Sequence, residues 1–278
     1  MFWLRQGSAP ATVLLLGLAC ATPQLVPREP PYRGTAFIDP DLIVASDPSA
    51  LRSLDYAGLD TRRMFDRRAE AFVPTDAFLF NAAFEGETTV EVQVNVEFGD
   101  AATAKRHAAF YARAIGQLPA GLRTRVETVW IHRGDMPFGG GNDNILIHTG
   151  KAAEYLRDGV LEEILMHEAA HTSLDPVHAA ADGWLAAQAA DGGCHPCARP
   201  TGAWTGSRVA RTAPPGFISD YARDHPGRED VAESFGPFFA VRHRPERISR
   251  DMAETIEATM PNRIEFFDRL ELDMHPVR

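Results

Sequence analysis

The chain has 278 residues, of which 45% are hydrophobic and 24% are charged, a composition typical of a globular protein with a sizeable buried core. Its net charge of −10 at pH 7 argues against a non-specific nucleic-acid binder, because such proteins present a basic face to the phosphate backbone. We therefore expect no nucleic-acid partner.

The N-terminus has the pattern of an export signal. Arg5 precedes a short apolar run over residues 11–19, which is too short to span a bilayer as a helix. Residues 1–21 are interpreted as a signal peptide or a lipoprotein signal, with an N-terminal core helix as the alternative. Residues 16–20 (LGLAC) resemble a lipoprotein box that would make Cys20 a lipid anchor, but the small residues around Cys20 also suit ordinary cleavage. The protein is thus expected to be extracellular or attached to the cell envelope.

A proline-rich segment over residues 22–36 predicts an extended tether, and a single folded domain is expected over 37–278. From 87 to 98 the chain alternates strictly between valines and polar residues, which predicts a strand with one buried face. Gly99 and Asp100 then end the strand and cap a helix that runs to about Gln117.

The remaining elements follow from the same signals. In chain order they are a strand over 125–132, a flexible glycine turn over 139–142, a strand over 144–149, helices over 158–174 and 184–190, a surface loop over 192–216, a helix over 229–241, and two helical stretches punctuated by Pro245 and Pro261. Strands followed by helices predict an α+β fold, with a small mixed sheet packed on helices.

The loop over 192–216 contains Cys194 and Cys197. In an oxidising compartment the two residues can close a small disulfide loop. The alternative is a thiol–disulfide enzyme, but its CxxC motif normally opens a helix after a strand, whereas this one lies among glycines and prolines.

The pentad His167-Glu168-Ala169-Ala170-His171 indicates a catalytic zinc site. Histidines four residues apart on a helix leave the same face, so both imidazoles can bind one ion at about 2.0–2.1 Å. Glu168 is rotated away from the two histidines and can act as the general base on a water molecule. The pattern therefore predicts one Zn2+ ion.

A catalytic zinc ion needs a third protein ligand and one open position. The metzincin spacing is excluded, because Leu174 and Val177 occupy its glycine and histidine positions. Asp175 is one turn beyond His171 and can be a ligand or a hydrogen-bond partner of an imidazole, with the second role favoured. A distant glutamate on a second helix is the remaining source of the third ligand.

Glu229 and Glu233 share one face of the helix predicted over 229–241. Glu229 can be the third ligand, and Glu233 can accept a hydrogen bond from a ligating histidine. Upstream, Tyr221 can donate its phenol hydrogen to the oxyanion of a tetrahedral intermediate.

These motifs resemble those of the gluzincin metallopeptidases, and most closely the catalytic domain of anthrax lethal factor-like peptidases. The resemblance covers about residues 140–241 and implies a zincin-like fold, with Glu229 as zinc ligand and Tyr221 as an aid to catalysis. The segments at 138–150 (FGGGNDNILIHTG) and 167–175 (HEAAHTSLD) also resemble segments of a set of secreted proteins. This second resemblance does not indicate a substrate.

The sequence therefore favours zinc-dependent hydrolysis of peptide bonds in a protein or peptide substrate. The catalytic residues would be Glu168 and Tyr221, and the metal ligands His167, His171 and Glu229. The alternative on the same scaffold is an inactive zinc-binding protein that acts as a binding module.

Overall fold

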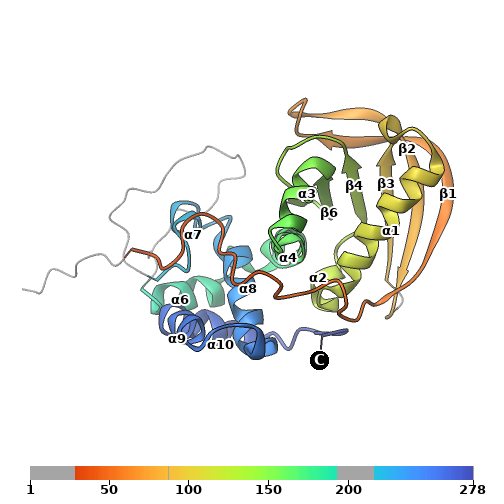
Figure 1. The fold of residues 1–278 in the computed structure, drawn as a ribbon. Helices are drawn as coiled ribbons and strands as arrows, with labels where there is room; N and C mark the ends of the chain where they lie inside the picture. The colour runs from red at the N-terminus through yellow and green to blue at the C-terminus, as the bar shows by residue number, and fades with distance from the viewer. Residues whose placement is uncertain (1–28, 87, 193–215, 278) are drawn as a thin grey trace, which may run out of the picture.

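The computed structural model describes residues 29–86, 88–192 and 216–277, and Figure 1 shows how their helices and strands are arranged. The expected export signal, with the anchor at Cys20, lies outside the described residues. So does the expected pair of Cys194 and Cys197. Within the described ranges, no helix is both long enough and apolar enough to cross a membrane.

The fold is α+β, as predicted, and it contains a six-stranded mixed sheet in the order β1-β2-β3-β4-β6-β5. Strands β3, β4 and β6 are parallel, while β1, β2 and β5 run antiparallel to their neighbours. The strands are β1 Leu51–Asp66, β2 Ala71–Phe84, β3 Thr89–Asn95, β4 Thr128–His132, β5 Gly139–Gly141 and β6 Asn144–His148.

The helices α1, α3 and α4 lie beside the sheet, and α6, α8, α9 and α10 form a second group beyond α4 (Figure 1). The helices are α1 Ala101–Gln117, α2 Ala120–Arg123, α3 Thr149–Arg157, α4 Leu161–Ser173, α5 Asp175–His178, α6 Asp182–Ala190, α7 Asp220–Asp224, α8 Asp230–His243, α9 Arg250–Thr259 and α10 Pro261–Arg269. Two 3-10 turns cover Val96–Phe98 and Pro245–Arg247.

The helix predicted after Gly99 is α1, and its start and end are confirmed. The Asp100 side chain accepts a hydrogen bond from the Thr103 N–H at 2.7 Å, as an N-cap residue should. The helix ends at Gln117, because Leu118 is extended and Pro119 cannot continue the hydrogen-bond ladder. The helix predicted over 158–174 is α4, but it begins only at Leu161.

The main core lies between the sheet and its helices. Val90, Val92 and Val94 are buried there, so the predicted apolar face of β3 is confirmed. Leu161, Leu165 and other apolar residues of α4 are buried in the same core. This packing fixes α4, the helix with the histidine pair, against the sheet.

The opposite face of the sheet is also largely covered, which corrects the expectation of a single buried face. Gln93 is only 4% exposed, and its amide donates to Glu91 Oε1 at 2.7 Å. The far end of the β1–β2 hairpin bends over this face (Figure 1), and Phe72 packs edge-on against Trp130 at 5.9 Å between ring centroids. The hairpin therefore shields polar residues of β3 that the alternation assigned to an exposed face.

The structure differs from the sequence prediction at residues 139–141, which form strand β5 rather than a flexible turn. Strand β6 is consequently an inner strand, and β5 forms the edge of the sheet beside α4. Helix α3 was not predicted. Gly159, at φ +71°, separates α3 from α4 in a conformation that other residues rarely adopt.

The described chain makes tertiary contacts earlier than Phe37, within the segment expected to be a tether. The Tyr32 N–H donates to the Ile218 carbonyl at 3.2 Å, and Tyr32 bridges to Ser219. The Gly34 N–H donates to Asp220 Oδ1 at 2.6 Å. We refer to residues 32–38 as the N-terminal strap.

Two histidines are buried at the ends of neighbouring parallel strands. His132 and His148 are both 0% exposed, and their rings stack with centroids 5.5 Å apart. The Asn95 amide nitrogen lies 3.2 Å from His132 Nδ1, and His148 Nδ1 lies 2.9 Å from the Arg133 carbonyl. These bonds fit neutral rings, and burial lowers the pKa of His132 to about 4.

Stability is expected to fall in mild acid because of His132. Its pKa is lower in the folded protein than in the unfolded chain, so the unfolded chain binds the proton first as the pH falls below about 6.5. Protonation of His132 alone should lower the unfolding free energy by about 2 kcal/mol between pH 7.5 and pH 5. Urea unfolding at both pH values checks this, and His132→Asn should show a smaller difference between them. An equal pH dependence in both proteins would contradict the assignment.

Candidate metal centre

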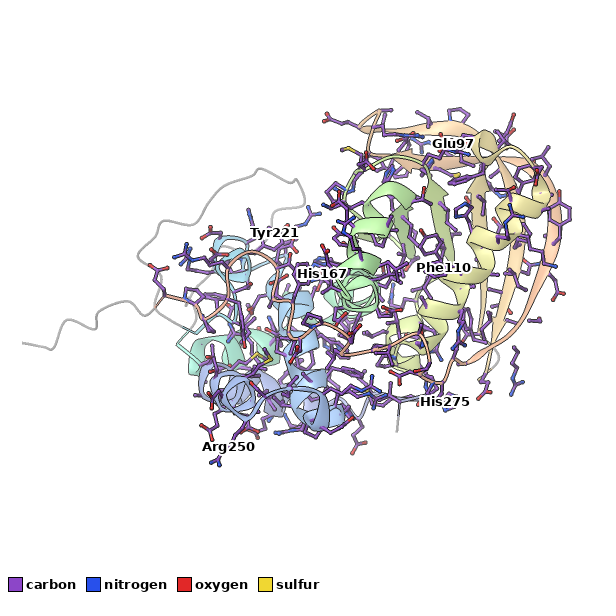
Figure 2. The ribbon with its side chains drawn as sticks, in the orientation of Figure 1. Glu97, Phe110, His167, Tyr221, Arg250 and His275 are labelled. Atoms are coloured by element: carbon purple, nitrogen blue, oxygen red, sulfur yellow. The ribbon has the colours of Figure 1, made fainter. Side chains whose placement is uncertain are left out.

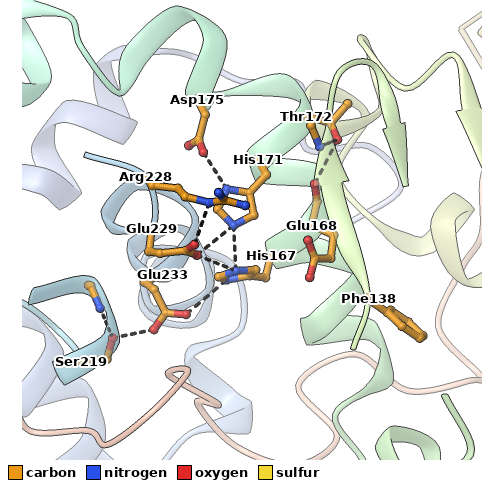
Figure 3. Close-up of polar contacts among 12 residues, drawn as sticks. Phe138, His167, Glu168, His171, Thr172, Asp175, Ser219, Arg228, Glu229 and Glu233 are labelled. Atoms are coloured by element: carbon orange, nitrogen blue, oxygen red, sulfur yellow. Dashed lines mark hydrogen bonds and ion pairs between the residues drawn. The ribbon is translucent and has the colours of Figure 1, made fainter. Parts of the chain in front are cut away.

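The site lies where α4 faces the start of α8. His167 and His171 project from α4 toward Glu229, the residue that precedes α8 (Figure 3). One ligand atom from each of these three residues lies within 4.8 Å of the other two, and they form the only such group of three or more His, Cys, Asp or Glu among the described residues. The structure thus brings together the three residues that the sequence predicted as metal ligands.

The distances show how closely the three ligand atoms converge. His171 Nε2 lies 3.0 Å from both His167 Nε2 and Glu229 Oε2. His167 Nε2 lies 3.5 Å from the same carboxylate oxygen. All three side chains are largely shielded from solvent, with 11%, 11% and 5% of the side chain exposed.

Carboxylates engage the other ring nitrogens. Asp175 Oδ2 lies 2.6 Å from His171 Nδ1, and Glu233 Oε1 lies 3.3 Å from His167 Nδ1 (Figure 3). A carboxylate at Nδ1 favours the proton on that nitrogen and leaves Nε2 with a free lone pair. Of the two roles open to Asp175, the structure shows the partner of an imidazole.

The donor set fits a cation. With both ring protons on Nδ1, two Nε2 lone pairs and a carboxylate oxygen point at one another with no hydrogen between them. Such acceptors repel one another unless a positive charge lies among them. Two imidazoles and one carboxylate are also a common ligand set of catalytic zinc.

The shifts in pKa point the same way. Burial lowers the pKa of His171, but hydrogen bonds to Asp175 and Glu229 outweigh it, so the pKa lies well above its usual value. Burial raises the pKa of Glu229, but hydrogen bonds and charge from both histidines bring it far below its usual value. The site therefore favours a positive charge between these groups, which is supplied by a proton on the imidazoles when no metal ion is bound.

Glu233 is held in place from three directions. The Ser219 hydroxyl donates to Glu233 Oε2 at 2.5 Å, and the Ala36 N–H of the N-terminal strap donates to the same oxygen at 2.9 Å. Its other oxygen lies 3.3 Å from His167 Nδ1, but the contact lacks hydrogen-bond geometry, so the predicted hydrogen bond from a ligating histidine is not formed directly. Ser219 and Ala36 were not predicted, because only the tertiary fold brings them to α8.

Tyr221 lies on α7, next to the metal centre (Figure 2). Burial is the main cause that raises the pKa of its phenol, and the charge of Glu229 and a hydrogen bond with Glu229 raise it further. The phenol is therefore beside the Glu229 carboxylate and keeps its proton at neutral pH. Its role as a hydrogen-bond donor to an oxyanion stays a prediction.

Arg228 also belongs to the site, although no sequence pattern predicted it. Its Nε lies 3.2 Å from Glu229 Oε1, and 54% of its side chain is exposed. Arg228 contacts Oε1 of Glu229, whereas the two histidines contact Oε2. Arg228 thus helps to orient the carboxylate.

Glu168 lies beside His167, on the side of α4 that faces strand β5 (Figure 3). The edge strand is joined to α4 through Thr172, whose hydroxyl accepts from the Gly141 N–H at 2.8 Å and donates to the Asn144 carbonyl at 2.8 Å. A Cβ atom on Gly140 would lie 2.0 Å from the Glu168 carbonyl oxygen. The strand can approach the helix this closely only because residue 140 has no side chain.

Gly140→Ala should therefore move β5 away from α4. We expect a loss of about 1–3 kcal/mol in unfolding free energy, the usual cost of an added methyl group that meets backbone in a packed site. Urea unfolding of the variant and the wild type measures the difference. Unchanged stability would show that strand β5 and helix α4 leave room for a side chain at residue 140, and would contradict this close contact.

No protein-family model, curated protein or solved structure matches the chain. The function of this chain is therefore inferred from its own residues.

Proposed function

We propose that this protein is an exported zinc peptidase with a zincin-like catalytic domain, and that it hydrolyses peptide bonds in protein or peptide substrates. The observation that carries the proposal is the convergence of His167, His171 and Glu229, whose ligand atoms lie within 4.8 Å of one another. Glu168, in the next position to one ligand, supplies the carboxylate that such a reaction requires.

Zinc is the metal that best suits this donor set, because imidazole nitrogen and carboxylate oxygen are its usual ligands outside cysteine sites. When bound, a zinc ion polarises a carbonyl group and lowers the pKa of a coordinated water molecule to about 7. His167, His171 and Glu229 would hold it. Asp175 and Glu233 would keep the two imidazoles in the correct tautomer.

The protein's own groups account for the proton transfers. Glu168 accepts a proton from the attacking water molecule and can pass it to the leaving amine. Tyr221, whose phenol keeps its proton, donates a hydrogen bond to the oxygen of the scissile carbonyl. Strand β5, as the edge of the sheet beside Glu168, can pair with an extended substrate backbone.

A digest of a peptide library tests this proposal. The mature protein should cleave peptides as isolated with zinc, lose cleavage after treatment with a chelator, and regain it when zinc is added. Zinc binding without cleavage of any peptide would instead support the inactive zinc-binding module. A protein that neither contains nor binds zinc would contradict both.

A further inference from the structure

A small pocket lies beside His167. Glu163 and Met166 of α4, Glu233 of α8 and the N-terminal strap line it, together with His167. The space inside that the centre of a water molecule can occupy is about 10 Å³. A cavity of this size is large enough to hold one water molecule.

Two buried carboxylate oxygens at the pocket lack hydrogen bonds. Among the described residues, Glu163 Oε2 has no partner, and Glu233 Oε1 has only the 3.3 Å contact with His167 Nδ1, which is too poorly aligned to be a hydrogen bond. Glu163 is 6% exposed and Glu233 is 2% exposed. Buried polar groups without partners are rare, because each costs about 1–3 kcal/mol.

We propose that one water molecule occupies this pocket and links Glu163 to Glu233, so that Glu163 is a positioning residue for His167. The proposal rests on the metal centre described above. In this arrangement Glu163 holds the water, the water positions the Glu233 carboxylate, and the carboxylate orients the His167 imidazole.

The hydrogen atoms available at the pocket support this arrangement. The Leu42 N–H donates to Glu163 Oε1 at 3.1 Å, whereas Oε2 has no partner among the described residues. Burial raises the pKa of Glu163 to about 8, so at neutral pH its carboxyl group carries a proton. That proton can be donated from Oε2 to the water, and the water can donate to Glu233 Oε1.

The link would complete the surroundings of Glu233. Its Oε2 already accepts from Ser219 and Ala36, whereas Oε1 accepts no hydrogen bond from the described residues. A water molecule held by Glu163 restrains this oxygen, and the restrained oxygen keeps the His167 proton on Nδ1. His167 Nε2 then stays available to the metal.

A high-resolution crystal structure of the mature wild-type protein tests the water directly. We expect one density peak within about 3.2 Å of both Glu163 Oε2 and Glu233 Oε1. An empty pocket, or a direct contact between the two carboxyl groups, would overturn the proposal. This result does not depend on whether zinc is bound, so it is distinguishable from a failure of the proposed function.

Zinc affinity of three variants tests the positioning role. Glu163→Gln keeps a donor toward the water and should bind zinc within threefold of the wild type, as measured by competition with a fluorescent chelator. Glu163→Met removes the donor and should bind about tenfold or more weakly. Glu162→Met is the matched control, because Glu162 is also buried on α4 but does not line the pocket.

Wild-type affinity in a folded Glu163→Met protein would contradict the positioning role, as would an equal loss in Glu162→Met. Circular dichroism establishes that the variants fold. If Glu163→Met does not fold, nitrogen-15 spectra of the imidazoles in Glu163→Gln decide the question. They should show the His167 proton on Nδ1 as in the wild type, and a proton on Nε2 in both proteins would overturn the proposal.

Discussion

Glu168→Gln is expected to keep one zinc ion per chain and to lose peptide hydrolysis by about 10²- to 10⁴-fold, the usual contribution of a general base. Glutamine has nearly the same shape as glutamate, and Glu168 does not belong to the group of converging ligand atoms. The metal centre should therefore survive while the group that accepts the proton is lost. Steady-state kinetics on a peptide found by the library digest, with metal analysis of the same sample, measure both effects.

Glu162→Gln is the matched control for this variant. Glu162 is on the same helix, but it is buried near the start of α4 and away from the metal ligands. Its substitution should leave kcat within a few-fold of the wild type. Undiminished hydrolysis by Glu168→Gln would remove Glu168 from the mechanism.

Arg263→Met is expected to lower the unfolding free energy by about 3–5 kcal/mol, because it breaks a buried network of charges. Arg263 is on α10 and pairs with Asp191 and Asp230 at 3.0 Å each, and all three side chains are 0% exposed. Methionine keeps much of the volume but leaves two buried carboxylates without a positive partner. Asp230 directly follows Glu229, so loosening this network should also weaken zinc binding.

Urea unfolding of Arg263→Met beside Arg242→Met measures this effect. Arg242 pairs with Asp268 on the surface, where both side chains are about 40% exposed, and its loss should cost no more than about 1 kcal/mol. Equal stability of the two variants would mean that the buried network contributes little.

The sequence predicted the elements whose signals are local. The α1 boundaries follow from a capping aspartate and a terminating proline, and the position of His167 and His171 on one helix face follows from their spacing of four. The third ligand was predicted because two histidines cannot complete a zinc site. These inferences needed no knowledge of distant contacts.

The edge of the sheet could not be predicted in this way. Glycine has a low propensity for strands, so three successive glycines indicate a turn. Residue 140 must be glycine because a Cβ atom there would clash with the carbonyl oxygen of Glu168, 28 residues later in the chain. That constraint exists only in the folded protein. The β1–β2 hairpin was missed because most residues of β1 are exposed and its polar and apolar residues do not alternate clearly.

The residues that support the ligands were only partly predictable. Asp175 and Glu233 share helical spacing with a histidine or a ligand, and the sequence therefore identified both. Ser219 and the strap residue Ala36 donate hydrogen bonds to Glu233. These contacts join distant parts of the chain, so the periodicity of the sequence does not predict them. Ala36 contributes only its backbone N–H, so its side chain gives no sign of this role.

The most direct test of the central claim is an anomalous difference map, recorded at the zinc absorption edge, from crystals of the mature protein. The metal centre predicts a single peak between α4 and α8, coordinated by His167 Nε2, His171 Nε2 and a Glu229 carboxylate oxygen at about 2.0–2.2 Å. A map without a peak there, or a Glu229 side chain turned away from the two imidazoles, would contradict it.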